Sequence, residues 1–472
     1  MIAPETTTRK KKRYRIPLGR KKRTSLAMGF QAALSGGERK STLLFAPAEK
    51  HLITIAPTGA GKFRSVLAPE LLTYPGPVVC VDIKGEAYAV TARRRREMGQ
   101  RVVRLDPFEV VGPSSDSLNF FDLFDLPNAD LETDAQMVSS ILAGGASVSK
   151  DPFWDISAGG LVSGLIVYLA HHRDKAQQVL ASLREMIYGD DTDHRLAVLL
   201  DKCKSMHPMA RGEIAAYLMH PDRDTRPSVL STVRSYFKAL FSQRVEATFA
   251  ESTFSLAEIA TSEPISVYLI LPPNKLQSHN RLIRLWIMTL MSAITCRRQI
   301  PQWPTLFLMD EAAQLGHFSP LVQAITLGRG YGVRVHSFWQ DLSQLMTCYP
   351  TEWRTIINNC GVKQVFGQTD AFMAAGLDEL FQVSIKSLIG MGRKDQLLLR
   401  EREAVRASKL DYLKDRMFAG LFDPNPYYGG QWPSVPGLEV PFVANGNLSL
   451  HGISQCRCGE DGCDRQKGVN HG

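Results

Sequence analysis

One short stretch near the start of the chain constrains the fold more than any other. The apolar run His51–Ala56 is typical of a strand, and Phe63–Leu72 has helical spacing. Between them lies a glycine turn made of Pro57, Thr58, Gly59, Ala60, Gly61 and Lys62. A strand, a glycine-rich turn ending in lysine and a helix, in that order, form the phosphate-binding loop G-x-x-x-x-G-K-[ST]. The stretch therefore predicts an α/β fold with a nucleotide phosphate at the start of the helix.

The chemistry of this loop follows from its backbone. Gly59 and Gly61 let the chain curl so that successive N–H groups face a phosphate, and the helix start adds a partial positive charge. Lys62 is expected to contact the β- and γ-phosphates. Two positions depart from the pattern, because Ala56 replaces the first glycine and Phe63 replaces the Ser/Thr whose hydroxyl holds Mg²⁺. The second departure leaves open whether hydrolysis is impaired.

The order of apolar runs extends the α/β prediction along the chain. Strand-like runs and helical stretches alternate from residue 51 to 105, which is typical of a parallel sheet covered on both faces. Strand signals are nearly absent from 128 to 261 and then return. The predicted strands are His51–Ala56, Val78–Asp82, Arg101–Leu105, Ile265–Leu271, Thr305–Asp310, Val333–Phe338 and Val362–Gly367. The further predicted helices are Tyr88–Met98, Leu131–Leu142, Trp154–His171, Gln177–Tyr188, His194–Lys204, Gly212–Met219, Ser228–Ala250 and Arg281–Thr295.

These patterns predict one discontinuous α/β domain, with a central and mostly parallel sheet, interrupted by one all-α domain. The nucleotide-binding domain takes residues 46–127 and 263–425, and the all-α insertion takes residues 128–262. Residues 1–45 are predicted to be a basic, disordered arm. Residues 426–472, where Pro, Gly and Tyr are frequent at the start, are predicted to be a loose C-terminal segment.

A second apolar run ends in two acids, as the other half of such a site requires. The run that starts at Thr305 is followed directly by Asp310 and Glu311. A carboxylate at the carboxyl end of a buried strand is suited to hold Mg²⁺ through water, and its neighbour is suited to polarise the attacking water. Acids are common at any strand end, but the presence of Lys62 in the same α/β chain favours these roles for Asp310 and Glu311.

Three further features are candidates at or near this site. Gln340 follows the next strand and could sense the γ-phosphate, unless it is an ordinary solvated residue. Arg329 lies in the glycine turn Gly328–Gly332, and Arg334 comes just after it. In a ring, an arginine there could reach a neighbouring subunit's nucleotide; the alternative is a surface arginine. The segment Asp82–Glu86 follows a strand and is expected to shape the same rim.

The excess positive charge belongs to the first 25 residues. The chain has a net charge of +9, and residues 1–25 hold ten Lys/Arg against one acid, Glu5, so the remainder is balanced. Such an arm favours a polyanion, either nucleic acid or an anionic membrane, at about 1 kcal/mol per basic residue near lipid. A solvated arm without a single partner is the alternative. The expected contact residues are Lys10, Lys11, Lys12, Arg13, Lys21, Lys22 and Arg23.

Cysteine usage and apolar runs weigh against several other classes. Of eight cysteines, five stand singly, which is typical of reduced core thiols rather than of a disulfide framework. Cys456, Cys458 and Cys463, with His451 upstream, match no common zinc spacing. The longest weakly polar run, Ile156–Ala170, is shorter than the roughly 20 residues of a spanning helix. We therefore expect no transmembrane segment and, by the same inspection, no secretory signal.

At these segments the chain resembles the type IV secretion coupling proteins of bacterial conjugation, the TraG/TraD-like family. More broadly it is similar to the FtsK/HerA group of DNA-pumping ATPases. The resemblance covers roughly residues 45–428 in order. The matching segments are APTGAGK, ELLTYPGPVVCVDIKGEAYAVTARRRREMGQRVVRLDPF, DPFWDISAGGLVSGLIVYLA, NRLIRLWIMTL, LFLMDEAAQLG, GRGYGVRVHSFWQDLSQL, NNCGVKQVFGQTD and FDPNPYY.

The resemblance implies a RecA-like nucleotide domain with an inserted all-α domain, assembled as a homo-hexamer around a channel. It implies ATP and Mg²⁺ as cofactors, with Lys62 on the phosphates, Asp310 on the metal, Glu311 catalytic and Gln340 sensing the γ-phosphate. The implied partners are single-stranded DNA bound without sequence preference, the relaxase of the relaxosome, and the type IV secretion channel proteins. The implied location is the bacterial cytoplasm, with the basic arm able to contact the anionic inner membrane.

Two alternatives remain beside a DNA-translocating coupling protein. In the first, the chain has the same fold but does not drive DNA. It is then a nucleotide-binding receptor or scaffold whose ATP hydrolysis is impaired at Phe63. The other is a chromosome-partition or repair translocase with the same mechanism. The presence of Asp310, Glu311 and Gln340 argues against the scaffold, because a chain without hydrolysis has no chemical need for both acids there.

Overall fold

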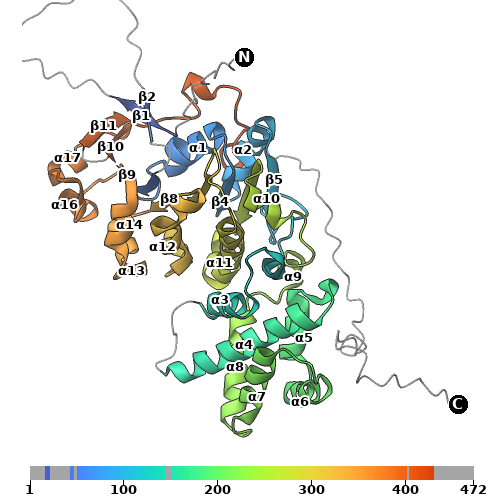
Figure 1. Ribbon diagram of the computed structural model, residues 1–472. Helices are drawn as coiled ribbons and strands as arrows, with labels where there is room; N and C mark the ends of the chain where they lie inside the picture. The colour runs from blue at the N-terminus through green and yellow to red at the C-terminus, as the bar shows by residue number, and fades with distance from the viewer. Residues whose placement is uncertain (1–15, 22–42, 47–49, 145–150, 401–402, 430–472) are drawn as a thin grey trace, which may run out of the picture.

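The computed structural model describes residues 16–21, 43–46, 50–144, 151–400 and 403–429, which build one sheet of 11 strands with helices on both faces (Figure 1). The strand order is β2-β1-β11-β10-β9-β3-β8-β7-β4-β6-β5. The strands are β1 (Pro17–Lys21), β2 (Leu43–Phe45), β3 (His51–Ile55), β4 (Val78–Asp82), β5 (Arg101–Leu105), β6 (Ile265–Ile270), β7 (Thr305–Met309), β8 (Val333–Trp339), β9 (Cys360–Val365), β10 (Asp395–Arg400) and β11 (Glu403–Ser408).

The centre of the sheet is parallel. β3 pairs in parallel with β8 and β9, and parallel pairing continues from β8 through β7, β4 and β6 to β5. β10 runs antiparallel to β9, and β11 antiparallel to β10, so β11 points the same way as β3. β1 and β2 complete that side with antiparallel pairs. The predicted α/β fold with a mostly parallel sheet is confirmed, and the carboxyl ends of β3, β7, β8 and β11 share one rim.

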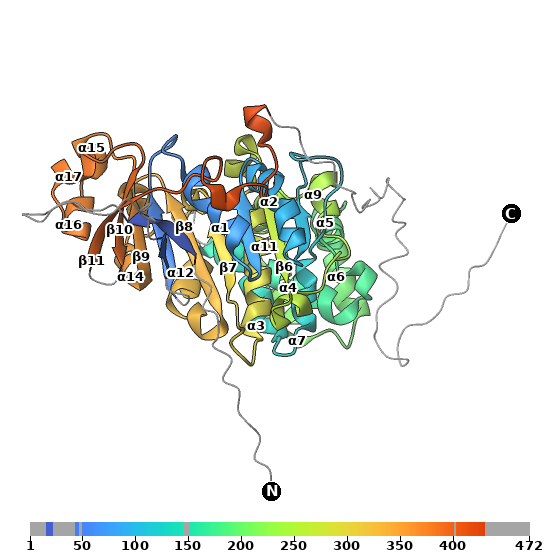
Figure 2. The same ribbon diagram turned by 90° about the horizontal axis from the view of Figure 1, so that it is seen from above.

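Burial on both faces explains why the central strands are continuous apolar runs. Every residue of β3, β4, β6, β7 and β8 is buried. On β3, Leu52 joins the apolar cluster under the helices α1 (Ala68–Thr73) and α2 (Glu86–Glu97). Its neighbour Ile53 joins the larger cluster on the other face, under α11 (Pro273–Thr295) and α12 (Ser319–Thr326). Because successive side chains alternate, each strand contributes to two cores, and helices flank the sheet seen from above (Figure 2).

All the regular elements described between β5 and β6 are helices, and most of them gather below the sheet (Figure 1). The division into domains at residues 127/128 and 262/263 stays a prediction. The predicted helix Ser228–Ala250 is wrong, because the chain leaves helical conformation between α8 and α9. The α-helices of this region are α3 (Leu131–Ala143), α4 (Pro152–His172), α5 (Leu180–Tyr188), α6 (Thr192–Lys202), α7 (Pro208–Met219), α8 (Thr225–Phe237), α9 (Gln243–Ala247) and α10 (Leu256–Thr261).

The helix α4 is the centre of this helical region and packs against α3, α7 and α8. A Cβ atom at Gly160 or Gly164 would come within 2.3 or 2.7 Å of Glu213 in α7, so glycine permits the close approach of the two helices. With 21 residues, α4 is the one helix among the described residues long and apolar enough to cross a membrane, and 56% of its apolar window is buried. The length argument drawn from Ile156–Ala170 is therefore wrong, because the helix extends beyond that run.

Both ends of the chain differ from the sequence-based prediction. Residues 1–45 are not wholly an unstructured arm, because β1 and β2 lie in the sheet. Residues 426–428 form a 3₁₀ turn, η7 (Pro426–Tyr428), rather than a loose segment. Lys21 is the last residue of β1. The other predicted DNA- or membrane-contact residues, Lys10, Lys11, Lys12, Arg13, Lys22 and Arg23, lie outside the described residues, as do the three C-terminal cysteines.

The segment Lys409–Tyr428, which we call the strap, follows β11 and crosses the helices after the phosphate loop (Figure 1). The backbone N–H of Asp423 donates to the carbonyl of Val90 in α2, with an N···O distance of 3.0 Å. The strap contributes three buried residues to an apolar cluster that also contains residues of α1 and α2. The members of this cluster are Leu410, Tyr412, Phe418, Ala68, Leu72 and Val90.

Candidate nucleotide-binding site

The predicted phosphate loop has the expected form. It leaves β3 at the shared rim, and Gly59 and Gly61 adopt φ angles of 78° and 93°, which favour glycine. The chain then enters η1 (Phe63–Leu67), a π-helical turn that continues into α1. The Lys62 side chain is 8% exposed, and its Nζ donates to the carbonyl of Ala56 at 3.1 Å. The lysine therefore folds back over the loop, where a phosphate would lie.

Three of the predicted site residues meet at this point. The Nζ of Lys62 lies 3.2 Å from Oε1 of Glu311, and the Nε2 of Gln340 donates to Oε2 of the same glutamate at 3.0 Å. Glu311 follows β7 and Gln340 follows β8, the strand between β7 and β3. Glu311 has φ 51° and ψ 53°, a left-handed conformation that costs a side chain on the order of 1 kcal/mol. This conformation turns the chain sharply at the end of β7.

Two carboxyl groups at this rim have strongly raised pKa values. Burial, followed by the charge of Glu311, raises the pKa of Asp310 to about 7, although Lys62 opposes the shift. Burial also raises the pKa of Asp82 to about 7, although its carboxylate accepts the backbone N–H of Tyr88 at 2.8 Å. Both acids end adjacent strands, β4 and β7, so a bound cation would favour their ionised forms.

Asp310 fits a magnesium ion that is shared with nucleotide phosphates. Its side chain makes no hydrogen bond to the described residues, so its oxygens are available. Mg²⁺ typically binds one or two carboxylates together with substrate phosphates and keeps several waters. The described residues contain no group of three or more His, Cys, Asp or Glu placed to hold a metal. A single carboxylate in this position thus suits a metal that also binds nucleotide phosphates.

The Phe63 ring takes part in apolar packing. It packs edge-to-face on Tyr412 of the strap, with 5.9 Å between ring centroids, and contacts the two apolar clusters on that side of the sheet. The position therefore supplies no hydroxyl to a metal.

The two candidate arginines lie at the opposite rim of the sheet. Arg329 is exposed in η5 (Gly328–Tyr331), directly before β8, whereas the phosphate loop follows the carboxyl end of β3. Arg334 is buried, and its Nε donates to the carbonyl of Lys50 at 2.8 Å. Burial, with the charge of Arg334, lowers the pKa of the nearby His51 to about 4. Arg334 is thus a structural residue, and Arg329 lies far from the loop of its own chain.

The segment Asp82–Glu86 borders the site, as predicted, and is held by the strap. The Tyr427 hydroxyl donates to the carbonyl of Lys84 at 3.0 Å, and the side-chain amide of Asn425 donates to Glu86. Sequence reasoning missed this contact, because FDPNPYY carries no sign of the distant segment that it touches.

Two further residues at the loop were missed. Gly367 follows β9 with φ 76°, and a Cβ there would lie 2.6 Å from the Cβ of Ala60. Lys409 follows β11, and its Nζ donates to the carbonyl of Ala60 at 2.8 Å. The glycine at the end of a predicted strand was a usable signal for a close contact. Lys409 had none, because the β10–β11 hairpin was not predicted.

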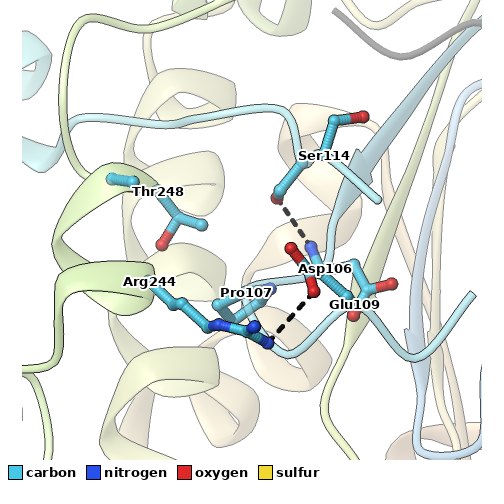
Figure 3. A pocket seen from close by; sticks show the side chains of 8 residues that line it. Asp106, Pro107, Glu109, Ser114, Arg244 and Thr248 are labelled. Carbon is cyan, nitrogen blue, oxygen red and sulfur yellow. Dashed lines mark hydrogen bonds and ion pairs between the residues drawn. The ribbon is translucent and has the colours of Figure 1, made fainter. Parts of the chain in front are cut away.

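Two concavities lie away from the phosphate loop. One lies at the carboxyl end of β5 and has a volume of about 20 Å³, which is enough for a single water molecule. There Arg244 of α9 lies 3.1 Å from Glu109 (Figure 3). The Asp106 carboxylate accepts the backbone N–H groups of Val110 and Val111. This small site ties the helical region to the sheet. A cavity of about 310 Å³ lies between α3, α11 and α12, and three of its lining residues are Met137, Met288 and Met291.

Comparison with known proteins places these features in a family. The family model for conjugative DNA transfer by the type IV secretory system matches residues 4–376. The conjugal transfer protein TraG of Escherichia coli is 24% identical over 351 residues, which cover 70% of this chain and 55% of TraG. VirD4 of Rhizobium radiobacter is 23% identical over 465 residues, which cover 90% of this chain and 66% of VirD4. The chain thus spans about half to two thirds of these relatives.

Solved structures of the plasmid coupling protein TrwB have the same fold. The TrwB complex with ADP and Mg²⁺ has a TM-score of 0.61 at 16% identity, over 77% of this chain and 86% of that chain. A TrwB complex with a non-hydrolysable ATP analogue has a TM-score of 0.60. The expected RecA-like architecture is therefore confirmed. Given the match over residues 4–376, the chain belongs to the type IV secretory system family of conjugative DNA-transfer proteins.

Proposed function

We propose that this chain is a coupling ATPase that links a relaxase–DNA complex to a type IV secretion channel and drives DNA toward it. The observation that carries the proposal is the convergence of Lys62, Glu311 and Gln340 at a phosphate loop. Two findings on relatives support it, since TraG is named a conjugal transfer protein and TrwB has been solved with ADP and Mg²⁺. Such a chain requires a nucleotide site whose hydrolysis can be coupled to movement.

The geometry supports a role for each residue. The loop N–H groups and Lys62 would bind the phosphates. Lys62 and Gln340 both contact Glu311, and a γ-phosphate would compete for both donors. Glu311 would then be free to accept a proton from the attacking water. Mg²⁺, when bound, would neutralise charge on the phosphates, and Asp310 would hold it through water.

The assembly that we propose is a ring of identical subunits, a homo-hexamer by resemblance. Arg329 is exposed at the rim opposite the phosphate loop, so it would act only on a nucleotide bound by a neighbouring subunit. The DNA would be single-stranded and held mainly through its phosphates, so binding would be sensitive to salt. The basic residues of the N-terminal arm would contact DNA or the anionic face of the inner membrane, with the chain on the cytoplasmic side.

A second candidate function is a nucleotide-binding receptor that recruits secretion substrates without hydrolysis. One specific observation favours it, namely that the Phe63 side chain supplies no hydroxyl and is packed on Tyr412. In this function Asp310 alone would orient the metal, and nucleotide binding would act as a signal.

Steady-state ATP hydrolysis, measured with increasing single-stranded DNA, distinguishes the coupling ATPase from the receptor. Lys62→Ala and Glu311→Gln test the site, and Lys202→Ala and Glu379→Gln, at exposed positions on α6 and α16 (Leu377–Phe381), are matched controls. A coupling ATPase should hydrolyse faster with DNA, and the activity should disappear in both site variants and persist in both controls. Bound nucleotide without hydrolysis at any DNA concentration would contradict the motor and favour the receptor.

A further inference from the structure

Lys409 places a second ammonium group beside the phosphate loop. Its Nζ donates to the carbonyl of Ala60 at 2.8 Å, and lies 3.9 Å from the position that a Cβ on Gly61 would take. The same ammonium group lies 4.6 Å from the centroid of the Phe366 ring. Lys409 directly follows β11, whose carboxyl end shares the rim of β3. A residue 349 positions along the chain from Ala60 therefore brings a positive charge to the loop.

In the part of the chain that the structure describes, no carboxylate pairs directly with this charge. Within the described residues, Lys409 has no ion pair within 4 Å, and the two acids that act on it electrostatically already have arginine partners. Asp395 lies 2.9 Å from Arg406, and Asp411 lies 2.6 Å from Arg64. Burial lowers the pKa of Lys409, as expected for an ammonium group partly withdrawn from water. An incompletely compensated cation at an anion-binding loop is a candidate ligand of the anion.

Lys62 differs from Lys409 because Glu311 lies 3.2 Å from its ammonium group. The two lysines also come from different parts of the chain. Lys62 ends the loop that follows β3, whereas Lys409 follows β11, three strands from β3 in the sheet. A phosphate chain bound to the loop N–H groups would therefore have two cations beside it, one from the loop itself and one from a distant part of the chain.

The strap is anchored at the first helical turn after the loop. The Nε and Nη2 of Arg64 donate to the two carboxylate oxygens of Asp411, at 2.7 and 2.6 Å. The Tyr412 ring packs on Phe63, and its backbone N–H donates to the carbonyl of Arg64 at 3.4 Å. Asp411 and Tyr412 follow Lys409 closely in the chain, so these anchors hold the lysine near the loop before any ligand binds. This reduces the conformational entropy that the lysine loses on binding.

We infer that Lys409 is a nucleotide-phosphate-binding residue that exchanges the carbonyl of Ala60 for a phosphate oxygen of a nucleoside di- or triphosphate. A phosphate oxygen accepts a charge-assisted hydrogen bond, which is roughly twice as strong as one to a neutral carbonyl. The inference rests on the proposed nucleotide site and adds to it a cation from the strap of the same chain.

The test measures the affinity of the full chain for ADP with Mg²⁺, with N-methylanthraniloyl-ADP as the fluorescent probe. Lys409→Gln retains an N–H donor for the Ala60 carbonyl but lacks the charge, and Lys409→Arg retains the charge. Lys414→Gln, at an exposed position of the strap, is the matched control. We expect Lys409→Gln to weaken binding about 10-fold and Lys409→Arg to stay within about twofold of the native chain. The control should have no effect.

Native affinity in Lys409→Gln would overturn the inference, because it would show that the lysine only holds the loop. Circular dichroism checks folding, and Lys409→Met serves as a second uncharged variant if Lys409→Gln does not fold. Lys62→Ala distinguishes this failure from that of the proposed function. If the native chain and Lys409→Gln both bind ADP but Lys62→Ala does not, only the inference about Lys409 is refuted. If the native chain does not bind ADP, the nucleotide site and the inference fall together.

Discussion

The contact between Gly367 and the phosphate loop makes a sharp steric prediction. A Cβ at Gly367 would lie 2.6 Å from the Cβ of Ala60, whereas ordinary contact begins at 3.4 Å. Because the Ala60 Cβ is bonded to the loop backbone, Gly367→Ala should displace the loop by about 0.8 Å. A displacement near 1 Å can lower the catalytic rate on the order of 10²-fold. The positive φ of Gly367 adds on the order of 1 kcal/mol of strain.

We therefore expect Gly367→Ala to weaken ADP binding at least about 10-fold and to lower the free energy of unfolding by about 1 kcal/mol. Gly99→Ala is the matched control, because Gly99 has a φ of 81° but open space around its Cβ position. It should carry the strain without the loss of affinity. Adding Ala60→Gly to Gly367→Ala removes the clashing atom and should restore binding. Equal affinities for Gly367→Ala and Gly99→Ala, or no recovery in the double variant, would refute the steric argument.

Two predictions concern buried polar groups. The buried Thr54 hydroxyl donates to Gln364 and lies 2.8 Å from Nε2 of His336, so Thr54→Val should lower the free energy of urea unfolding by about 2–4 kcal/mol. Thr326→Val is the control, because Thr326 is exposed and its hydroxyl donates to the carbonyl of Val322 in its own helix; it should cost under about 0.5 kcal/mol. Equal small losses for the two variants would contradict the prediction. Burial raises the pKa of Asp82 from 3.8 to about 7, so the folded chain binds that proton more tightly than the unfolded chain. This stabilisation is complete below about pH 4 and is lost as the pH rises to about 7. Asp82→Asn should therefore flatten the fall in unfolding free energy between about pH 4 and 7; an unchanged slope would show that the carboxyl ionises normally.

Most of the central sheet was predictable, and the reason is burial. β3, β4, β6, β7 and β8 are covered on both faces, so each is a continuous apolar run of about the right length. The hairpin of β10 and β11 was not predictable in the same way, because β11 (EAVRAS) has only partial burial and no apolar run. The short strand β1 (PLGRK) contains proline and glycine, which are rare in isolated strand patterns.

The candidate site, too, was only partly predictable from the sequence. The amino-acid sequence alone specified the loop around Lys62 and the acids Asp310 and Glu311, because a glycine turn and a strand-end carboxylate depend on local backbone geometry. It could not place Gln340 against Glu311, Arg329 at the far rim, or the strap over the loop. Those arrangements follow from strand order and from contacts between residues hundreds of positions apart, such as Lys409 and Ala60. Local patterns encode which residues are buried and how the backbone turns, whereas long-range pairing in the folded chain sets which distant side chains meet.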